Sequence, residues 1–293
     1  MIDYKKIITD REVRLKIINK LALIPTKPFL KMVYYIKTGK KLNLDNPVTF
    51  CDKLNWLKIN DIHPEYTDLV DKVKVREHVN KIMGRDMFFP LYGAWDHYSD
   101  IDFDSLPNKF VLKCNHDSAS VNIIKDKSSI NHHELEKFYE GRLKINPYNM
   151  GREYPYKNVK PQIIAEKFMI EEGKSDINDY KFFCFNGKPE LMFVATDRSD
   201  DCCFDFYDMD FNHLDIENIH PNSKKTISKP EKFEEMKEIA AKLTKGFKFC
   251  RLDLYEINGE IYFGEYTFFH AGGFWPMHPD EWEQKLGDMI PLN

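Results

Sequence analysis

The sequence predicts an α+β protein in which helices come first and antiparallel strands follow. Two observations carry this prediction. Apolar residues recur at helical spacing through the first 84 residues, and short apolar runs separated by turn residues replace them afterwards. The Asn-Gly pairs at 186–187 and 258–259 are typical of two strands joined by a tight turn. We therefore expect strands paired by hairpins rather than by the long crossovers that parallel strands need.

The first 84 residues predict three helices. Residues 4–24 alternate basic and aliphatic positions and stop at Pro25, which cannot donate a backbone hydrogen bond. Residues 46–60 and 66–84 repeat the helical spacing, and Gly84 is free to adopt the left-handed conformation that closes a helix. The helical part of the protein is thus expected near its N-terminus.

Strands are expected from residue 108 onward. Four segments carry strand patterns bounded by turn residues: 108–127, 160–173, 179–198 and 202–211. The last of these alternates as an exposed strand does. A helix is expected at 228–246, where Ser228 and Glu231 have the spacing of a capping box. Its apolar stripe consists of Phe233, Met236, Ile239, Ala240 and Leu243.

The bulk composition excludes several classes of protein. A net charge of −4 on 293 residues gives no global signal for nucleic-acid binding. The six cysteines form no C-x-x-C pair, and no long apolar run lies near the N-terminus, so we expect a cytoplasmic protein. Charge is uneven, because residues 1–41 carry a net +8 and leave −12 for the rest. This basic segment either contacts an anionic surface, such as the inner face of a membrane or a lipid-linked glycan, or folds back onto the acidic body.

The segment "RLDLYEINGEIYFGE", residues 251–265, sets three charges into a strand–turn–strand pattern. A two-residue turn at Asn258-Gly259 places Asp253 and Glu265 on opposite faces, because side chains alternate along a strand. A three-residue loop with Gly in a bulge places Arg251, Asp253 and Glu265 on one face. That shared face suits Mg²⁺ and phosphate, whereas charges turned to solvent make an ordinary surface salt bridge. The metal-site interpretation requires an odd loop, or a bulge that compensates for an even one.

Three other segments have the composition of a nucleotide site. Lys113 ends an apolar strand and precedes a loop of small residues, whose backbone N–H groups can approach phosphate. "EKFM" at 166–169 follows another strand and suits an adenine ring, with Asp179 further on for ribose. Lys72 lies at the start of a predicted helix. Taken alone, an ordinary polar turn, a solvated loop and a solvated lysine explain these segments equally well.

The order of these segments resembles that of the ATP-grasp fold. "FVLKCNH", "IIAEKF" and "FGEYTFFHAGG" are similar to the TupA-like branch, which is found with genes for cell-surface polysaccharides, and more distantly to D-alanine–D-alanine ligases. The resemblance covers nearly the whole chain. It implies two α+β subdomains that grip ATP between antiparallel sheets, after a short helical N-terminal region. We expect that region at 1–70, the central subdomain with the phosphate loop at 71–164, and the C-terminal subdomain with the adenine connector and metal hairpin at 165–293.

The resemblance also implies roles for individual residues, with ATP and Mg²⁺ as cofactors. The residues implied for ATP are Lys72 and Lys113 at the phosphates, Ser118, Ala119 and Ser120 in the loop over them, Glu166, Lys167, Phe168 and Met169 at the adenine, and Asp179 at the ribose. The implied metal ligands are Asp253, Glu265 and Thr267. Arg251 and Lys113 are the implied catalytic residues, because they stabilise the transferring phosphoryl group.

Three features depart from the family pattern. Thr267 stands where related ligases have Asn, and a hydroxyl is a poorer neutral metal ligand than an amide oxygen, so the second metal is in question. The phosphate loop contains no Gly and is expected to close more stiffly. The N-terminal region is short where larger members have a substrate domain, so we expect the acceptor to be held differently.

The activity that the resemblance implies is ATP-dependent ligation of a carboxylate to an amine. The carboxylate takes the γ-phosphoryl group of ATP, an acyl phosphate forms, and an amine displaces phosphate. The expected partners are a carboxylate-bearing sugar or glycan, such as a uronic acid, and an amine or amino acid, in the synthesis of capsular or other surface polysaccharide. The expected substrate contacts are His270, Gly272, Gly273, Arg198 and Arg152. A glycine turn among core aromatics is the alternative interpretation of "HAGG".

Two functions of other classes stay open. The D-x-D patterns at 102–104 and 208–210 are those with which glycosyltransferases hold a metal and a nucleotide sugar. Thr267 and the glycine-free loop are compatible with a scaffold that binds ATP without turning it over.

Overall fold

The computed structural model describes residues 21–171, 176–197 and 202–292. The helix expected over 4–24 lies almost wholly outside these residues, and so does Arg198. Within them, two antiparallel sheets with helices around them confirm the α+β class. No helix in the described ranges is long and apolar enough to cross a membrane.

Four described helices precede the first strand: α3 (Thr26–Thr38), α4 (Phe50–Asn60), α5 (Tyr66–Val70) and α6 (Val75–Met83). α3 is not predicted from the sequence, because Pro25 is interpreted as the end of the preceding helix. Pro25 is instead the N-cap of α3, and Pro28 lies in its first turn, where a missing N–H costs little. The expected helix over 46–60 is confirmed by α4, which begins at a capping box formed by Thr49 and Asp52.

The single helix expected over 66–84 is wrong, because Asp71 divides it into α5 and α6. The Asp71 side chain accepts a hydrogen bond from the backbone N–H of Val73 at 2.9 Å and another from the Asn115 amide at 3.0 Å. These bonds offer the backbone an alternative to the helix. Gly84 closes α6 in the left-handed conformation, as expected, with a φ of 73°.

The smaller sheet has four antiparallel strands in the order β1-β4-β2-β3. They are β1 (Leu91–Trp95), β2 (Phe110–Cys114), β3 (Asn122–Ile124) and β4 (Ile163–Lys167). Phe110 and Ile163 are fully buried in a core that also holds Tyr139 of α7 (His132–Arg142). α8 (Tyr148–Gly151) follows α7 on the way to β4. The subdomain boundary expected between 164 and 165 falls inside β4.

The larger sheet has six antiparallel strands in the order β10-β9-β5-β6-β7-β8. They are β5 (Asp179–Phe185), β6 (Lys188–Thr196), β7 (Cys203–Asp208), β8 (His213–Leu214), β9 (Phe249–Ile257) and β10 (Glu260–Thr267). Both expected hairpins are present, β5–β6 and β9–β10. The exposed strand expected over 202–211 is wrong in its burial, because Phe206 of β7 is fully buried between its neighbours.

α9 (Phe233–Leu243) packs on one face of the larger sheet, and all five residues of its expected apolar stripe are buried. The capping box expected at Ser228 and Glu231 is wrong, because α9 begins after Lys232 without a side-chain cap. The chain ends with a 3₁₀ turn (His270–Gly273) and α10 (Glu281–Asp288), which packs beside α4.

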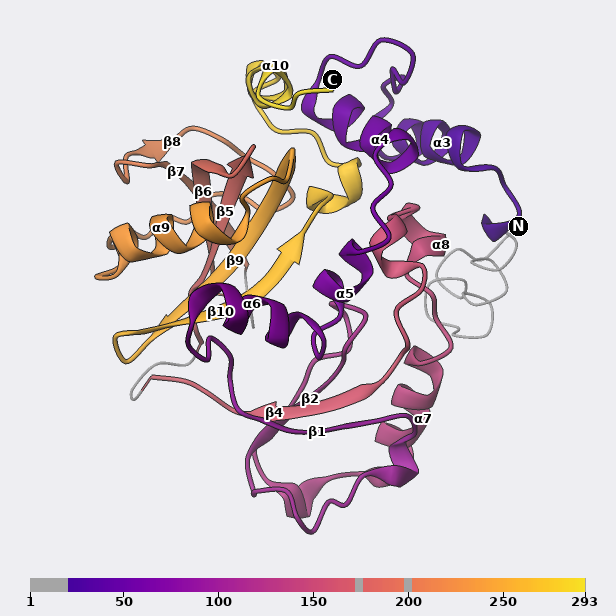
Figure 1. Ribbon diagram of the computed structural model, residues 1–293, viewed down its shortest axis with the longest axis vertical. Coiled ribbons are helices and arrows are strands. Elements are labelled where there is room, and N and C mark those ends of the chain that lie inside the picture. The colour runs from indigo at the N-terminus through magenta and orange to yellow at the C-terminus, as the bar shows by residue number, and fades with distance from the viewer. Residues whose placement is uncertain (1–20, 172–175, 198–201, 293) are drawn as a thin grey trace.

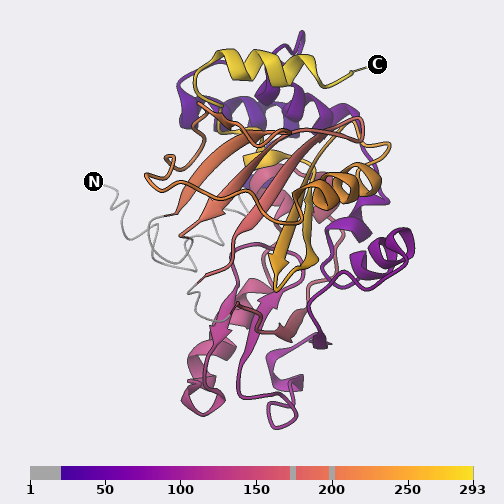
Figure 2. The ribbon, with the colours of Figure 1, turned by 90° about the vertical axis from the view of Figure 1, so that its left-hand side faces the viewer.

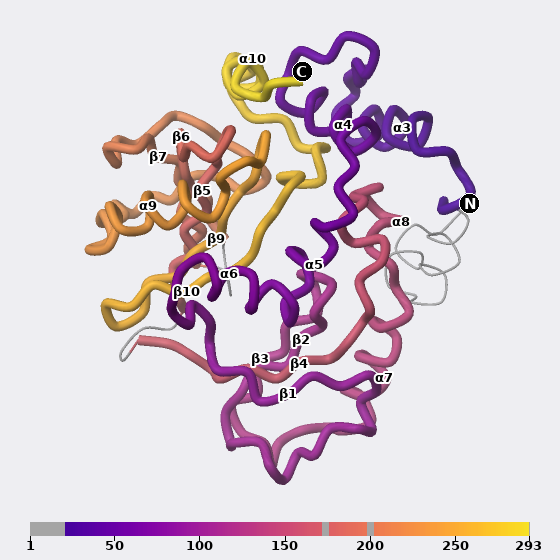
Figure 3. Tube along the Cα trace, viewed as in Figure 1, coloured from indigo at the N-terminus to yellow at the C-terminus, as the bar shows by residue number. Residues whose placement is uncertain are grey.

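Figure 1 shows the larger sheet above the smaller one, with α5 and α6 at the level where the two meet. Figure 2 shows α10, α3 and α4 over the end of the larger sheet that is far from the smaller sheet. The tube in Figure 3 follows the chain from α6 down into β1. β4 leaves the smaller sheet toward the β9–β10 hairpin, where Glu171 accepts a hydrogen bond from the backbone N–H of Asn258 at 3.2 Å.

Candidate functional site

The β9–β10 hairpin has a two-residue turn and a compensating bulge. Asn258 and Gly259 have φ values of 54° and 74°, and Ile257 pairs with Glu260. The odd loop is therefore wrong. The register shifts at Gly264, so that Glu265 lies opposite Asp253 and the two carboxylates share one face.

Arg251 is the centre of a buried charge cluster on that face. Its Nε and Nη2 each donate to one oxygen of Asp253 at 2.7 Å. Nη2 also donates to Glu265 at 3.2 Å and to the Thr267 hydroxyl at 3.0 Å. Burial opposes ionisation, yet Asp253 raises the pKa of Arg251, and Arg251 and Lys181 lower the pKa of Asp253. Both shifts favour the charged forms of Arg251 and Asp253.

Lys181 completes the cluster and is a residue that the sequence prediction missed. β5 pairs with β9 so that Lys181 lies opposite Asp253, with which it forms an ion pair. Its Nζ also lies 2.6 Å from Asp179 Oδ2. Asp179, expected at the ribose, is buried in this cluster. The alternation of Asp179 and Lys181 with aromatic residues in "DYKFFCF" is the signal that could have identified both as partners of the hairpin.

His270 lies behind Arg251 and is buried. Arg251 Nη1 donates to His270 Nδ1 at 3.0 Å, and His270 Nε2 lies 2.9 Å from Asn218 Oδ1. Asn218 donates its amide N–H groups to the carbonyls of Trp275 and Pro276, which leaves its oxygen to accept from the imidazole. Burial and Arg251 lower the pKa of His270 well below its usual value, so the ring is neutral. His270 therefore orients Arg251, and no motif identified Asn218.

The turn around Gly272 and Gly273 is clamped by α4. Lys58 Nζ donates to the carbonyl of Gly272 at 2.6 Å, and Asn55 donates to that of Gly273 at 2.6 Å. Both glycines have positive φ, and the N–H of Gly272 already donates to Phe269. The backbone N–H of Gly272, an expected substrate contact, is thus already used, and the turn serves to hold His270.

On the smaller sheet, Lys113 and Glu166 project from the same face of the paired strands β2 and β4. Lys113 Nζ lies 2.5 Å from Glu166 Oε2, and Arg76 Nη1 lies 3.4 Å from Glu166 Oε1. Glu166 is buried by these cations. The structure places Glu166, expected at the adenine, as the ion-pair partner of Lys113 and Arg76.

The expected phosphate loop is tied to the smaller sheet at one end. The Ser120 hydroxyl accepts from the backbone of Cys114 at 2.7 Å and donates to Asp117, which Arg142 binds with two N–H groups. Ser118 and Ala119 are exposed, whereas Ser120 is buried. Only the first two are therefore free to face a ligand.

Lys72 is influenced by charged residues of both sheets. Its Nζ donates to the carbonyl of Asp117 at 2.6 Å. Burial lowers its pKa, Glu265 of the larger sheet opposes this, and Lys113 lowers the pKa further. Lys72, Lys113 and Glu265, which are far apart in the sequence, thus lie in one electrostatic neighbourhood.

The expected adenine connector leaves the sheet at Lys167, whose N–H donates to Pro90 at 2.8 Å. Phe168 and Met169 lie beyond the strand, and their backbone groups bond to no other backbone group of a described residue. A free peptide edge beside a partly buried ring is what an adenine needs.

Arg152 does not lie in the cluster, although it was expected at the substrate. It is 2% exposed, and its guanidinium donates to the carbonyls of Asn149, Leu21 and Ile24. It thereby attaches α8 to the segment that precedes α3. The expectation for Arg198 lies outside the described residues.

The donors on the hairpin face fit a hard divalent cation. Asp253, Glu265 and Thr267 offer only oxygen atoms, and the two cations against three carboxylates of the cluster leave one formal negative charge. Within the described ranges no three His, Cys, Asp or Glu side chains form a metal site by themselves. Mg²⁺ typically takes one or two carboxylates and completes its shell with phosphate and water.

The D-x-D patterns form turns. Asp102 accepts from the backbone N–H of Asp104 at 3.1 Å, and Asp208 accepts from those of Asp210 and Asn212 at 2.9 and 2.8 Å. These bonds are those of Asx turns at loop tips. They explain both patterns without a metal.

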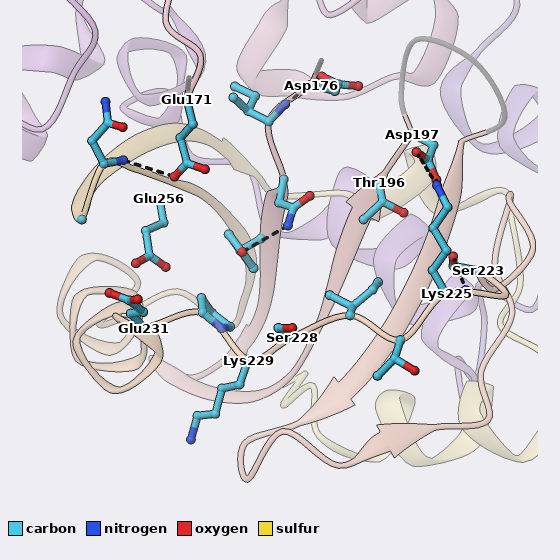
Figure 4. Close-up of a pocket in the computed structure, with 18 residues that line it drawn as sticks. Glu171, Asp176, Thr196, Asp197, Ser223, Lys225, Ser228, Lys229, Glu231 and Glu256 are labelled. Carbon is cyan, nitrogen blue, oxygen red and sulfur yellow. Dashed lines mark hydrogen bonds and ion pairs between the residues drawn. The ribbon is translucent and has the colours of Figure 1, made fainter. Parts of the chain in front are cut away.

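A pocket of about 840 Å³ lies on the opposite face of the larger sheet, beside the loop that enters α9 (Figure 4). Five carboxylates line it: Glu171, Asp176, Asp197, Glu231 and Glu256. Lys225 is paired with Asp197 at 2.8 Å, as the dashed lines show. An acidic lining disfavours phosphate, so this pocket does not compete with the hairpin face for a nucleotide.

Comparison with known proteins gives one family. The family described as TupA-like ATPgrasp matches residues 52–291. No curated protein matches the sequence.

Among solved structures, D-alanine–D-alanine ligase from Bacillus anthracis in complex with ATP is similar at 17% identity and a TM-score of 0.42, over 76% of this chain and 63% of that one. The corresponding enzyme from Helicobacter pylori is 16% identical with a TM-score of 0.41, over 76% and 61%. Phosphoribosylamine–glycine ligase from Thermotoga maritima is 15% identical with a TM-score of 0.38, over 69% and 48%. This chain thus spans less than two thirds of each of them, and likenesses this distant carry no argument about its activity.

Proposed function

The chain belongs to the TupA-like ATP-grasp family, and on that premise we propose that it is an ATP-dependent ligase that joins a carboxylate to an amine. The observation that carries this proposal is the shared face of Arg251, Asp253 and Glu265, with Lys72 and Lys113 in the same neighbourhood. Fixed cations beside paired carboxylates are what ATP and a divalent ion require together.

Each cation in the site has a defined support. Lys113 is held by Glu166, Lys72 by the carbonyl of Asp117, and Arg251 by Asp253 and His270. Charges held in place before the reaction stabilise a transferring phosphoryl group without reorganisation. Phe168 and Met169 would contact the adenine, because their peptide edge is free to bond it.

The reaction we propose has two steps. The carboxylate attacks the γ-phosphoryl group of ATP and gives an acyl phosphate and ADP, and an amine then displaces phosphate. Mg²⁺, held by Asp253 and Glu265 with Thr267 as a neutral oxygen, would supply charge neutralisation at the phosphates. The part of this chain is positioning and electrostatics, and no side-chain nucleophile is needed.

The proposed substrates are a uronic-acid-type carboxylate of a surface glycan and an amine or amino acid. The family resemblance to enzymes of cell-surface polysaccharide synthesis suggests the first. The basic N-terminal segment, with a net +8 over residues 1–41, suggests an anionic membrane or lipid-linked glycan as the surface on which the substrate is presented.

ADP release in the presence of uronates and amines tests the proposal. We expect release that requires Mg²⁺ and falls at least about 100-fold in Glu265→Ala, since oxyanion and charge stabilisation carry effects of that size. Release that ignores both Mg²⁺ and this substitution would sink the proposal.

A scaffold that binds ATP without turnover is the second candidate. It is favoured by Asp253, which Arg251 and Lys181 already neutralise, and by Thr267 in place of the usual Asn. Nucleotide binding with no amine-dependent ADP release would identify the scaffold.

A further inference from the structure

Glu153 is a carboxylate near the proposed reaction centre that the reaction described above does not use. It follows Arg152, whose left-handed backbone (φ 56°) ends α8. The Arg152 side chain contacts the segment before α3, whereas that of Glu153 lies near Gly272. A methyl group added at Gly272 would lie 3.6 Å from Glu153 Oε1. The carboxylate therefore lies against the turn that holds His270.

The segment from Glu153 to Tyr156 is influenced by the charges of the metal hairpin. Burial raises the pKa of Glu153, Lys58 opposes this, Glu265 raises it further, and Arg251 opposes it. Burial also raises the pKa of Tyr156 above its usual value, and Glu265 and Glu153 add to that shift. Two residues of one short segment thus share Glu265 as an electrostatic neighbour, and the proximity of Glu153 to Gly272 places its carboxylate against the turn that holds His270.

Glu153 is not engaged in a structural bond. Its carboxylate forms no hydrogen bond or ion pair with any residue in the described ranges, unlike Asp253, Asp179 and Glu166. Lys58 is close, but its Nζ donates to Gly272 at 2.6 Å and to Asn55 at 3.2 Å, and it lies 4.2 Å from the centre of the Phe274 ring. Lys58 thus fixes the turn and leaves the carboxylate of Glu153 available to a ligand.

We propose that Glu153 receives the amine substrate and takes up the proton that the amine loses when it attacks the acyl phosphate. This inference rests on the proposed ligase function. The ammonium group bound at Glu153 first loses one proton to solvent and becomes the attacking amine. A C–N bond then forms and the C–O bond to phosphate breaks, phosphate leaves with that electron pair, and the second N–H proton passes to Glu153.

The charges favour an amine over the carboxylate substrate at this place. Glu153 and Glu265 repel an anion, whereas an ammonium group is attracted by both. Arg251, which donates to Glu265 at 3.2 Å, is the group suited to the anionic acyl phosphate. Glu153 and Arg251 would then hold the two reactants on opposite sides of the bond that forms.

Hydroxylamine separates this inference from the function on which it rests. It is uncharged at neutral pH and traps acyl phosphates as hydroxamates without a base or an ammonium site. Wild-type protein with ATP, Mg²⁺ and D-glucuronate or D-galacturonate is assayed for hydroxamate with hydroxylamine and for amide with L-alanine. The variants are Glu153→Gln, Glu153→Asp and, as a matched control, Glu136→Gln at an exposed position of α7.

We expect the ratio of amide to hydroxamate to fall at least about 100-fold in Glu153→Gln, which is the usual size of a general-base effect. The loss should appear in both KM for the amine and kcat, while KM for ATP stays near that of wild type. Glu153→Asp keeps the charge and should recover part of the ratio, and it replaces the Gln variant if that protein does not fold. Glu136→Gln should keep the wild-type ratio.

The outcomes are distinguishable. An unchanged ratio in both Glu153 variants, with hydroxamate formed, would overturn the amine site and leave the ligase function intact. If wild-type protein forms no hydroxamate from either uronate, the proposed function fails and the amine site fails with it.

Discussion

Arg251 is the residue that contacts most of the other charged and polar side chains of the hairpin face. It bonds Asp253 through two N–H groups, contacts Glu265 and Thr267, and is oriented by His270. Because Asp253 is 1% exposed, its charge depends on this partner and on Lys181. A buried charge that loses its partner is far more costly than a surface one.

The first prediction concerns this dependence. Arg251→Met should lower the free energy of unfolding by about 3–5 kcal/mol, because it leaves Asp253 buried with one cation fewer. The double variant Arg251→Met/Asp253→Asn should be less destabilised than the single one, since the unpaired charge is gone. Urea unfolding followed by circular dichroism measures both. A loss in the double variant equal to the sum of the losses in Arg251→Met and in Asp253→Asn alone would show that the pair is not coupled.

The second prediction uses the depressed pKa of His270. An unfolded histidine binds a proton below about pH 6.5, whereas the buried His270 does not, so the folded state loses stability as pH falls through that value. His270→Gln removes this loss. The difference in unfolding free energy between wild type and variant should therefore shrink as the pH is lowered from about 7.5 to about 5.5. A difference that is constant with pH would contradict a neutral, buried His270.

At the scale of elements, the bulge at Gly264 decides which face the carboxylates share. A Cβ at Gly264 would lie 3.0 Å from the carbonyl oxygen of Asp253 and 3.1 Å from the Tyr255 ring. At Gly259, in the turn of the same hairpin, a Cβ would meet nothing within 4 Å. Gly264 is thus required because a side chain there would clash with its neighbours, whereas Gly259 is required only for its left-handed backbone.

The third prediction follows from that contrast. Gly264→Ala should reduce Mg²⁺-dependent ADP release at least about 10-fold, because it displaces Asp253 from Glu265. Small misplacements of reacting groups can lower a rate by up to about 100-fold. Gly259→Ala should leave ADP release near wild type and cost about 1–2 kcal/mol of stability, because Ala is strained at φ 74°. If both variants release ADP like wild type, the bulge does not set the site.

The sequence anticipates elements where the pattern is local and fails where distant partners decide. Both hairpins follow from their Asn-Gly pairs. The shared charged face of the second does not follow from its alternation, because with a two-residue turn it needs the bulge at Gly264, which depends on how β10 packs on β9. The break at Asp71 needs Asn115, and the role of His270 needs Asn218, and neither partner is near in the sequence.

At the scale of the whole molecule, the protein places one set of cations on each sheet. Lys113 and Lys72 belong to the smaller sheet and its approach, Arg251 and Lys181 to the larger one. A nucleotide between them would contact cations from both sheets. Figure 1 shows α5 and α6 where those bodies meet.

The fourth prediction concerns the N-terminal region. α3 exposes Tyr35 and Ile36 at 59% and 73%, and residues 1–41 carry a net +8. We expect the protein to co-sediment with vesicles of anionic lipid and to be released by salt, since basic segments beside apolar side chains bind such surfaces. Ile36→Glu should weaken binding, and Ile123→Glu, on exposed β3, should not. Equal binding to neutral vesicles, or equal effects of the two variants, would count against this surface.

The most direct measurement of the central claim is calorimetric titration of a non-hydrolysable ATP analogue with and without Mg²⁺. Wild type, Glu265→Ala and Glu256→Ala are compared, because Glu265 lies on the face of Arg251 and Glu256 lines the pocket on the other face of the same sheet. The account predicts binding that depends on Mg²⁺, falls at least about 10-fold in Glu265→Ala, and is unchanged in Glu256→Ala. Binding that is independent of Mg²⁺, or that the two substitutions weaken equally, would contradict it.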